Sequence, residues 1–114
     1  MKREFLDYID DIIEAMNECL EFTQGMEYEE FIKDSKTVKA VTRNLEIIGE
    51  AVGKIPDKIK KEYPQIEWNK IIGMRNKLIH EYFGVDNKII WDTIKNNLPI
   101  SKPFFEKIIQ NNNT

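Results

Sequence analysis

The sequence predicts an all-α fold, an antiparallel helical bundle. Apolar residues recur at steps of three and four over most of the chain, which is the period of an amphipathic helix. Glycines, prolines and capping residues divide this pattern into separate helices. No stretch alternates apolar and polar residues as a strand does, and there is no internal repeat. At 114 residues the chain is expected to form one domain, 1–114, with a tail that frays from residue 110.

The first half of the chain predicts two long helices with a short one between them. The first spans roughly 3–24 and stops at Gly25, a residue common just after helix ends. A short acidic helix is expected at 27–32. The second long helix starts at Asp34 or Ser35, either of which can cap it. The two predicted buried faces consist of Phe5, Ile9, Ile12, Ile13, Met16, Cys19 and Leu20, and of Val38, Val41, Leu45, Ile48, Val52 and Ile55.

A third long helix follows a proline-bounded connection. Pro56 ends the second long helix and opens a brief helical turn that reaches Tyr63. The third helix covers roughly 68–83, and Gly84 terminates it.

The C-terminal part predicts two further helical pieces. Asp86 can cap a helix through 87–97. Pro99 is expected to interrupt this helix before a last amphipathic piece at 104–109, because proline removes a backbone donor and clashes with the preceding turn.

Composition indicates a soluble globular protein of the cytosol. The hydrophobic fraction is 41% and the charged fraction 32%, which disfavours disorder. A single cysteine, Cys19, excludes an internal disulfide and a cysteine-based metal site. The first residues are charged and lack the apolar core of a signal peptide, and no uncharged apolar run approaches the roughly 20 residues of a membrane span. We therefore expect a cytoplasmic protein without a membrane segment, and no cofactor is indicated.

Charge is distributed unevenly along the chain. The formal net charge is −3. Residues 1–30 contain two basic and ten acidic side chains, whereas residues 54–77 contain seven basic and three acidic ones. Such a basic segment is compatible with a local anion-binding face, because attraction to phosphate depends on the local charge. An ordinary solvated lysine-rich surface is the alternative.

The third long helix carries an arginine in the middle of its apolar face. With residues placed about 100° apart around the axis, Arg75 lies at the centre of an apolar arc, and Tyr82 lies about 20° from it. Asn76 and His80 share a neighbouring seam, four residues apart, so the amide can orient the imidazole. Lys77 lies on the solvent side. The apolar arc consists of Trp68, Ile71, Ile72, Leu78, Ile79 and Phe83.

Each of these polar residues has a structural explanation, but together they favour phosphate chemistry. Arg75 could form a core ion pair, His80 could be an ordinary surface histidine, and Tyr82 could be a core residue. RNA cleavage without a metal, however, needs a base for the 2′-hydroxyl and a cation for the crowded phosphorane, roles that suit His80 and Arg75. A two-fold homodimer would supply a second copy of each.

The stretch "RNKLIHEY" matches the R-x4-H-x-Y form of the HEPN motif. This motif and the sequence around it resemble the HepT-like toxin family of HEPN-domain ribonucleases. The resemblance extends over nearly the whole chain, through the blocks "REFLDYIDDIIEAM", "KAVTRNLEIIGEAVGKIP", "YPQIEWNKIIGMRNKLIHEYFGVD" and "IIWDTIKNNLP". It implies a HEPN-type bundle that dimerises at the motif, and metal-independent endoribonuclease activity as the toxin of a toxin–antitoxin pair.

The resemblance also assigns the site. It implies that Arg75 and His80 are catalytic, that the polar motif residue Asn76 binds RNA or supports the site, and that no metal is used. The neighbouring Lys77 is a further candidate for binding RNA or supporting the site. The implied partner is a minimal nucleotidyltransferase antitoxin, which binds the toxin and adds AMP to Tyr82. Sparse basic charge and the lack of an aromatic stacking platform make folded RNA such as tRNA a plausible substrate.

Two other functions are compatible with the same residues. One is a non-catalytic helical dimer that acts as the docking partner and substrate of the nucleotidyltransferase. The other is a nucleotide-binding module with Arg75 as a phosphate clamp, which lacks a glycine-rich phosphate loop. The middle block adds Arg43, predicted to form a surface ion pair with Glu46 and Glu50, and Asn44, predicted at the edge of the core.

Overall fold

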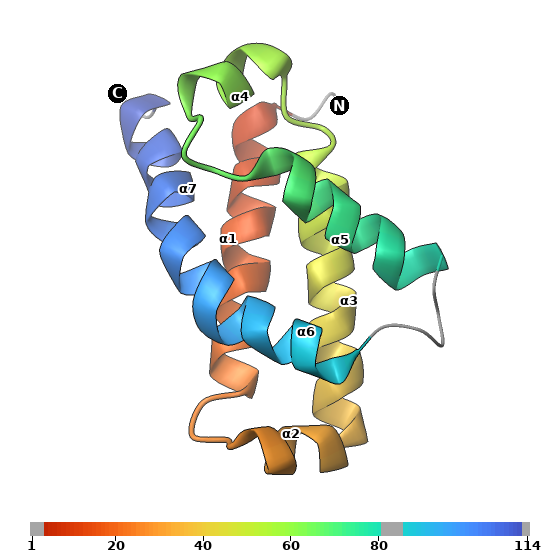
Figure 1. The fold of residues 1–114 in the computed structure, drawn as a ribbon. Coiled ribbons are helices and arrows are strands. Elements are labelled where there is room, and N and C mark those ends of the chain that lie inside the picture. The colour runs from red at the N-terminus through yellow and green to blue at the C-terminus, as the bar shows by residue number, and fades with distance from the viewer. Residues whose placement is uncertain (1–3, 81–85, 113–114) are drawn as a thin grey trace.

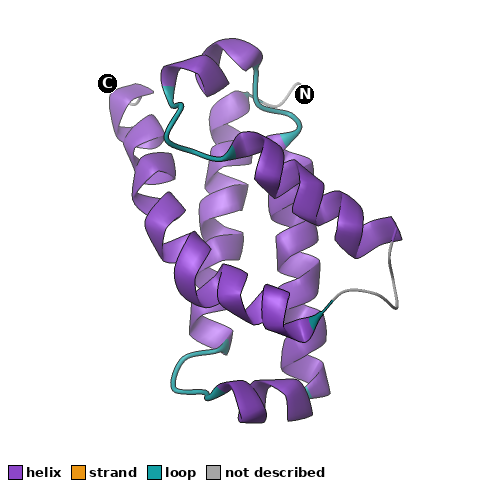
Figure 2. Ribbon diagram, in the orientation of Figure 1, coloured by secondary structure: helices purple, strands orange, loops and turns teal. Residues whose placement is uncertain are grey.

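The protein consists of helices joined by short loops. The computed structural model describes residues 4–80 and 86–112, and that part of the chain contains no strand (Figure 2). The fold is therefore all-α, as the sequence predicts. The elements are α1 Phe5–Phe22, α2 Tyr28–Lys33, α3 Ser35–Val52, α4 Asp57–Glu62, α5 Trp68–His80, α6 Asn87–Asp92, the π-helical segment η1 Thr93–Asn97, and α7 Leu98–Asn112.

Helices α1 and α3 form the centre of the bundle. They lie side by side and run in opposite directions, α7 packs against α1, and α5 packs against α3 (Figure 1). The short helices α2 and α4 lie at opposite ends of the bundle. Helices α5 and α6 cover the same side of the α1–α3 layer and lie apart from each other (Figure 1).

The core is continuous and lies between the long helices. The predicted stripes of α1 and α3 are confirmed, with their members buried or partly buried against this core. Helix α3 begins where the sequence predicts, because Asp34 accepts hydrogen bonds from the backbone N–H (3.1 Å) and the hydroxyl (2.8 Å) of Thr37. The largest fully buried side chains are Phe31, Phe105, Ile9, Ile12, Met16, Ile48, Ile94 and Ile108.

The prediction that Pro99 interrupts the C-terminal helix is wrong. Helix α6 continues through η1 into α7 without a break, and Pro99 lies in the first turn of α7. The backbone N–H of Leu98 donates to the carbonyl of Thr93, five residues back, so the helix widens just before the proline. In a regular α-helix the proline ring clashes with the carbonyl four residues back, and proline has no N–H to donate to that carbonyl. The π segment changes the hydrogen-bond register in the turn before Pro99 and so accommodates both effects.

The C-terminal helix also extends further than predicted. Helix α7 runs to Asn112, past the point at residue 110 where the tail was expected to fray. The side-chain amide of Asn111 donates to the hydroxyl of Tyr63 at 2.9 Å, which connects α7 to the end of α4. This bond gives the last turn a tertiary contact that periodicity alone does not reveal.

Candidate active site on helix α5

The N-terminal end of α5 is firmly anchored. Trp68 is buried, its indole N–H donates to the backbone carbonyl of Tyr63 at 3.1 Å, and its ring packs edge-on against Phe105 with 5.5 Å between ring centroids. Leu78 is buried near the other end of the helix. These contacts fix the direction in which α5 crosses the bundle.

The C-terminal end of α5 is less buried than the helical wheel suggests. Ile71 and Ile72 are half-buried, and Ile79 is 37% exposed. Phe83, the last residue of the predicted apolar face, lies outside the described residues, as does Tyr82. The end of the motif helix therefore presents apolar surface that the described part of the chain does not cover.

Arg75 lies where α5 crosses α3, and its partner there is a glycine. A Cβ placed on Gly49 of α3 would lie 2.6 Å from Cγ of Arg75 and nearer still to its Cβ. The same Cβ would lie 3.4 Å from the backbone oxygen of Ile71. The base of the Arg75 side chain therefore occupies space that exists only because residue 49 has no side chain.

The guanidinium of Arg75 is incompletely satisfied. One terminal nitrogen, Nη1, donates to Oδ1 of Asn76 at 3.0 Å. The Nε atom is buried and has no hydrogen-bond acceptor among the described residues. Leaving a buried N–H donor unpaired costs about 1–3 kcal/mol. Within residues 4–80 and 86–112, Nη1 of Arg75 therefore has one acceptor and Nε has none.

A cavity of about 390 Å³ opens beside Arg75, between α5 and the C-terminal end of α3 with the first residues of the loop that follows it. Its wall carries two basic side chains, Lys54 and Arg75, and the carboxylate of Glu50. Glu50 also lies 3.9 Å from Arg43 on the outer surface of α3. The lining residues are Gly49, Glu50, Gly53, Lys54, Ile72 and Arg75.

The other predicted site residues lie on the exposed side of the same helix. Asn76, Lys77 and His80 are exposed, and His80 is the last residue of α5. Asn76 accepts its hydrogen bond from Arg75, so the structure pairs this amide with the guanidinium and not with the imidazole of His80. Tyr82, the predicted AMP acceptor, falls in the segment 81–85 that the structure does not describe.

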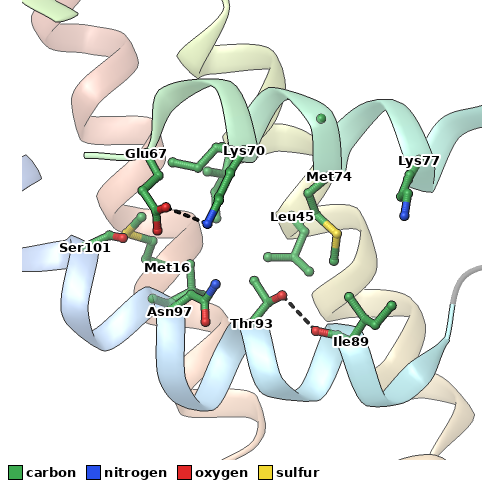
Figure 3. A pocket seen from close by; sticks show the side chains of 14 residues that line it. Met16, Leu45, Glu67, Lys70, Met74, Lys77, Ile89, Thr93, Asn97 and Ser101 are labelled. Atoms are coloured by element: carbon green, nitrogen blue, oxygen red, sulfur yellow. Dashed lines mark hydrogen bonds and ion pairs between the residues drawn. The ribbon is translucent and has the colours of Figure 1, made fainter. Parts of the chain in front are cut away.

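A second cavity, about 400 Å³, lies on the opposite flank of α5, between α5 and the segment formed by α6, η1 and α7 (Figure 3). Apolar residues of α1 and α3 line it, including Met16 and Leu45, and Met74 and Lys77 line it from α5. Lys70 is held there by Glu67 at 2.7 Å. This groove contains none of Arg75, Asn76 and His80, so only Lys77 connects it to the predicted site.

The structure agrees with the predictions for Arg43 and Asn44, two polar residues of α3. Arg43 is 62% exposed and pairs with Glu46 at 3.4 Å and with Glu50 at 3.9 Å, which confirms a surface ion pair. Asn44 is buried. The residue that sequence reasoning missed is Gly49, although a glycine in the middle of an amphipathic helix is itself a signal of close backbone approach.

The described part of the chain offers no further chemical centre of a familiar kind. Within residues 4–80 and 86–112, no three His, Cys, Asp or Glu side chains gather as metal ligands would. No described helix combines the length and the apolar character needed to cross a bilayer. Burial, and secondarily the charge of Glu18, raises the pKa of the Cys19 thiol to about 12.

Comparison with known proteins identifies the family. Residues 12–108 match the model of the family described as "Ribonuclease HepT-like". The chain belongs to this family. A HepT-like protein of Thermococcus cleftensis, named "Probable ribonuclease HepT", is 48% identical over 108 residues, covering 95% of this chain and 98% of the relative. Another, from Methanocaldococcus jannaschii and named "Putative RNase", is 50% identical over 109 residues, covering 96% and 90%.

Family membership agrees with the helical architecture. The all-α bundle is of the HEPN type that the motif resemblance implies. A HepT-like relative from Caldanaerobacter subterraneus, also named "Putative RNase", is 40% identical over 103 residues, which cover 90% of this chain and 92% of the relative. No solved structure matches the chain.

Proposed function

We propose that this protein is a metal-independent endoribonuclease that cleaves RNA with Arg75 and His80. The observation that carries the proposal is the arrangement on α5: a half-buried guanidinium, whose Nε has no acceptor among the described residues, lies five residues before an exposed imidazole. The family description and the names of the relatives, which refer to ribonucleases, support the same activity. Exposed Asn76 and Lys77 lie on the same helix and are suited to contact the RNA backbone.

The reaction needs no group outside the RNA and the protein. The imidazole of His80 removes the proton of a 2′-hydroxyl, and the oxygen attacks the adjacent phosphorus. Arg75 stabilises the negative charge that develops on the phosphorane oxygens. The bond from phosphorus to the 5′-oxygen then breaks, and that oxygen takes up a proton. The products are a 2′,3′-cyclic phosphate and a 5′-hydroxyl end.

One chain supplies only one histidine for the two proton transfers. A two-fold homodimer with the α5 helices facing each other provides a second His80 and a second Arg75. The exposed Ile79 between these residues supports an interface at this end of α5, because it presents apolar surface beside the polar groups. Each active centre then combines residues of both protomers.

The toxin role rests on the motif resemblance. We propose that the ribonuclease acts in the cytoplasm on folded RNA such as tRNA, as the toxin of a toxin–antitoxin pair. A minimal nucleotidyltransferase antitoxin binds it, in a hetero-oligomer, and transfers AMP to Tyr82. The added phosphodiester competes with RNA for the nearby arginine and repels the incoming backbone.

Cleavage of end-labelled RNA by the purified protein tests the activity. The wild type is expected to cleave equally with and without EDTA and to leave a 2′,3′-cyclic phosphate. His80→Ala should slow cleavage by about 10²–10⁴-fold with an unchanged circular dichroism spectrum. Lys39→Ala, which alters an exposed residue of α3, is the matched control. An active His80→Ala variant, or a strict requirement for added metal, contradicts the mechanism, and an inactive wild type favours the docking-partner alternative.

A further inference from the structure

The crossing of α3 and α5 is organised around one residue without a side chain. Gly49 lies in the interior of α3, in a position where glycine weakens a helix relative to alanine. It is buried, and Cβ and Cγ of Arg75 lie directly against it. An added Cβ would lie 2.6 Å from Cγ of Arg75, well inside the 3.5–4.0 Å separation that two carbon atoms prefer.

The consequence for Arg75 is geometric. Its Cβ is fixed to the backbone of α5, so rotation of the side chain cannot relieve the collision with an added Cβ. Instead α5 would have to move away from α3 by about 1 Å or more. The unpaired Nε and the cavity of about 390 Å³ beside it would move with the helix.

We propose that Gly49 is the positioning residue of the active site. It lets α5 approach α3 closely enough to hold the Arg75 guanidinium at its working position, and it acts through its contact with Cβ and Cγ of Arg75. The proposal rests on the proposed function, in which Arg75 stabilises the phosphorane. Displacement of a catalytic group by 1 Å can lower a rate by about 10²-fold.

Another glycine of the chain provides a matched control. A Cβ on Gly73 of α5 would meet no atom within 4 Å, and the residue is exposed. Gly73→Ala therefore introduces the same chemical change on the motif helix without a collision, and it should raise the melting temperature slightly through helix propensity. Val52→Ala, a truncation at a fully buried position of α3, controls for loss of stability as such.

The first measurement is the cleavage rate at saturating RNA, well below the melting temperature of each variant. Gly49→Ala is expected to lower the rate about 10–100-fold, whereas Gly73→Ala and Val52→Ala should cleave within about twofold of the wild type. In an Arg75→Gly background, which lacks the Cβ that the new methyl group meets, Gly49→Ala should cause no further loss. An equal loss in both backgrounds, or an unchanged rate in Gly49→Ala alone, overturns the proposal.

The second measurement observes Arg75 directly and does not depend on activity. The chain contains three arginines, so their side-chain Nε–H signals are few enough to assign in a ¹H–¹⁵N spectrum. The signal of Arg75 should exchange slowly with water because its Nε is buried. Gly49→Ala is expected to shift this signal or to speed its exchange, and Gly73→Ala is expected to leave it in place. An unmoved signal in Gly49→Ala overturns the proposal.

A double variant decides the outcome if Gly49→Ala does not fold. Arg75→Gly removes the Cβ with which the new methyl group collides, so Gly49→Ala combined with Arg75→Gly should fold again. If the double variant folds, the result supports the contact between residue 49 and the Arg75 side chain. If it does not fold, the added methyl group collides with other atoms of α5, and the proposal is overturned. A fully active Arg75→Ala variant would instead refute the proposed function, while the spectroscopic test of the contact would still stand.

Discussion

Arg75→Met should make the protein more stable and much less active. Methionine keeps the Cβ and Cγ that pack against Gly49 and places a methyl group where the buried Nε lies. The substitution removes an unpaired buried donor, whose cost is about 1–3 kcal/mol. It also removes the 3.0 Å bond from Nη1 to Asn76, which contributes about 0.5–1 kcal/mol. Methionine and arginine have similar helix propensities.

The balance of these effects is a stabilisation of up to about 2.5 kcal/mol. For a domain of this size that raises the melting temperature by up to about 10 °C. Loss of the charge that stabilises the phosphorane should at the same time slow RNA cleavage by about 10²–10³-fold. Thermal unfolding followed by circular dichroism and the cleavage assay measure the two effects on the same preparation.

Arg43→Met is the matched control because Arg43 is exposed and forms only surface ion pairs. It should change stability little and leave cleavage unaffected. The reasoning fails if Arg75→Met melts at a lower temperature than the wild type, since Nε would then have a favourable partner in solution. Repeating the measurement at two protein concentrations shows whether a second protomer provides that partner.

Three further predictions concern assembly, regulation and the buried thiol. Solution scattering at micromolar concentration should show a homodimer, and a monodisperse monomer would contradict the shared active centre. After co-expression with the nucleotidyltransferase, mass spectrometry should find AMP on Tyr82, and Tyr82→Phe should remain toxic but escape modification; an adduct on Tyr28 or Tyr63 would refute the assignment. Cys19 should resist thiol reagents at pH 8 until the protein unfolds, because burial raises its pKa to about 12. The free energy that the protonated thiol contributes to folding is complete below about pH 9 and declines as the pH rises toward 12. Labelling of Cys19 in the native protein at pH 8 would contradict the prediction.

The sequence predicts the helices well because their signals are local. The stripes of α1 and α3 follow from the three- and four-residue spacing, and Asp34 caps α3 as its residue type suggests. Pro99 misled the prediction because the rule that proline ends a helix also considers only neighbouring residues. The π segment before it, and the bond from Lys95 in that segment to the carbonyl of Thr23 at 2.9 Å, depend on how the C-terminal helix packs against the end of α1.

The sequence predicts the side of α5 on which Arg75 lies, but not the partners of its side chain. Helical geometry places Arg75 on the buried side of α5, and the structure agrees. The same geometry puts Asn76 beside His80, whereas in the structure the side-chain oxygen of Asn76 accepts a hydrogen bond from the guanidinium of Arg75. The contact between Arg75 and Gly49 joins residues 26 positions apart, and periodicity within a single helix cannot reveal it.

The two unfavourable features of the α3–α5 crossing have a common explanation. A glycine inside a helix costs about 0.5–1 kcal/mol relative to alanine, and an unpaired buried donor costs about 1–3 kcal/mol. Either cost could be avoided by an ordinary pair of apolar residues at the crossing, which would pack as the rest of α3 does. The two occur at one point of contact, between Gly49 and Arg75. The proposed catalytic role of Arg75 accounts for both, because the glycine sets the distance of the guanidinium from α3, and the described residues give Nε no acceptor that would compete with RNA for this side chain.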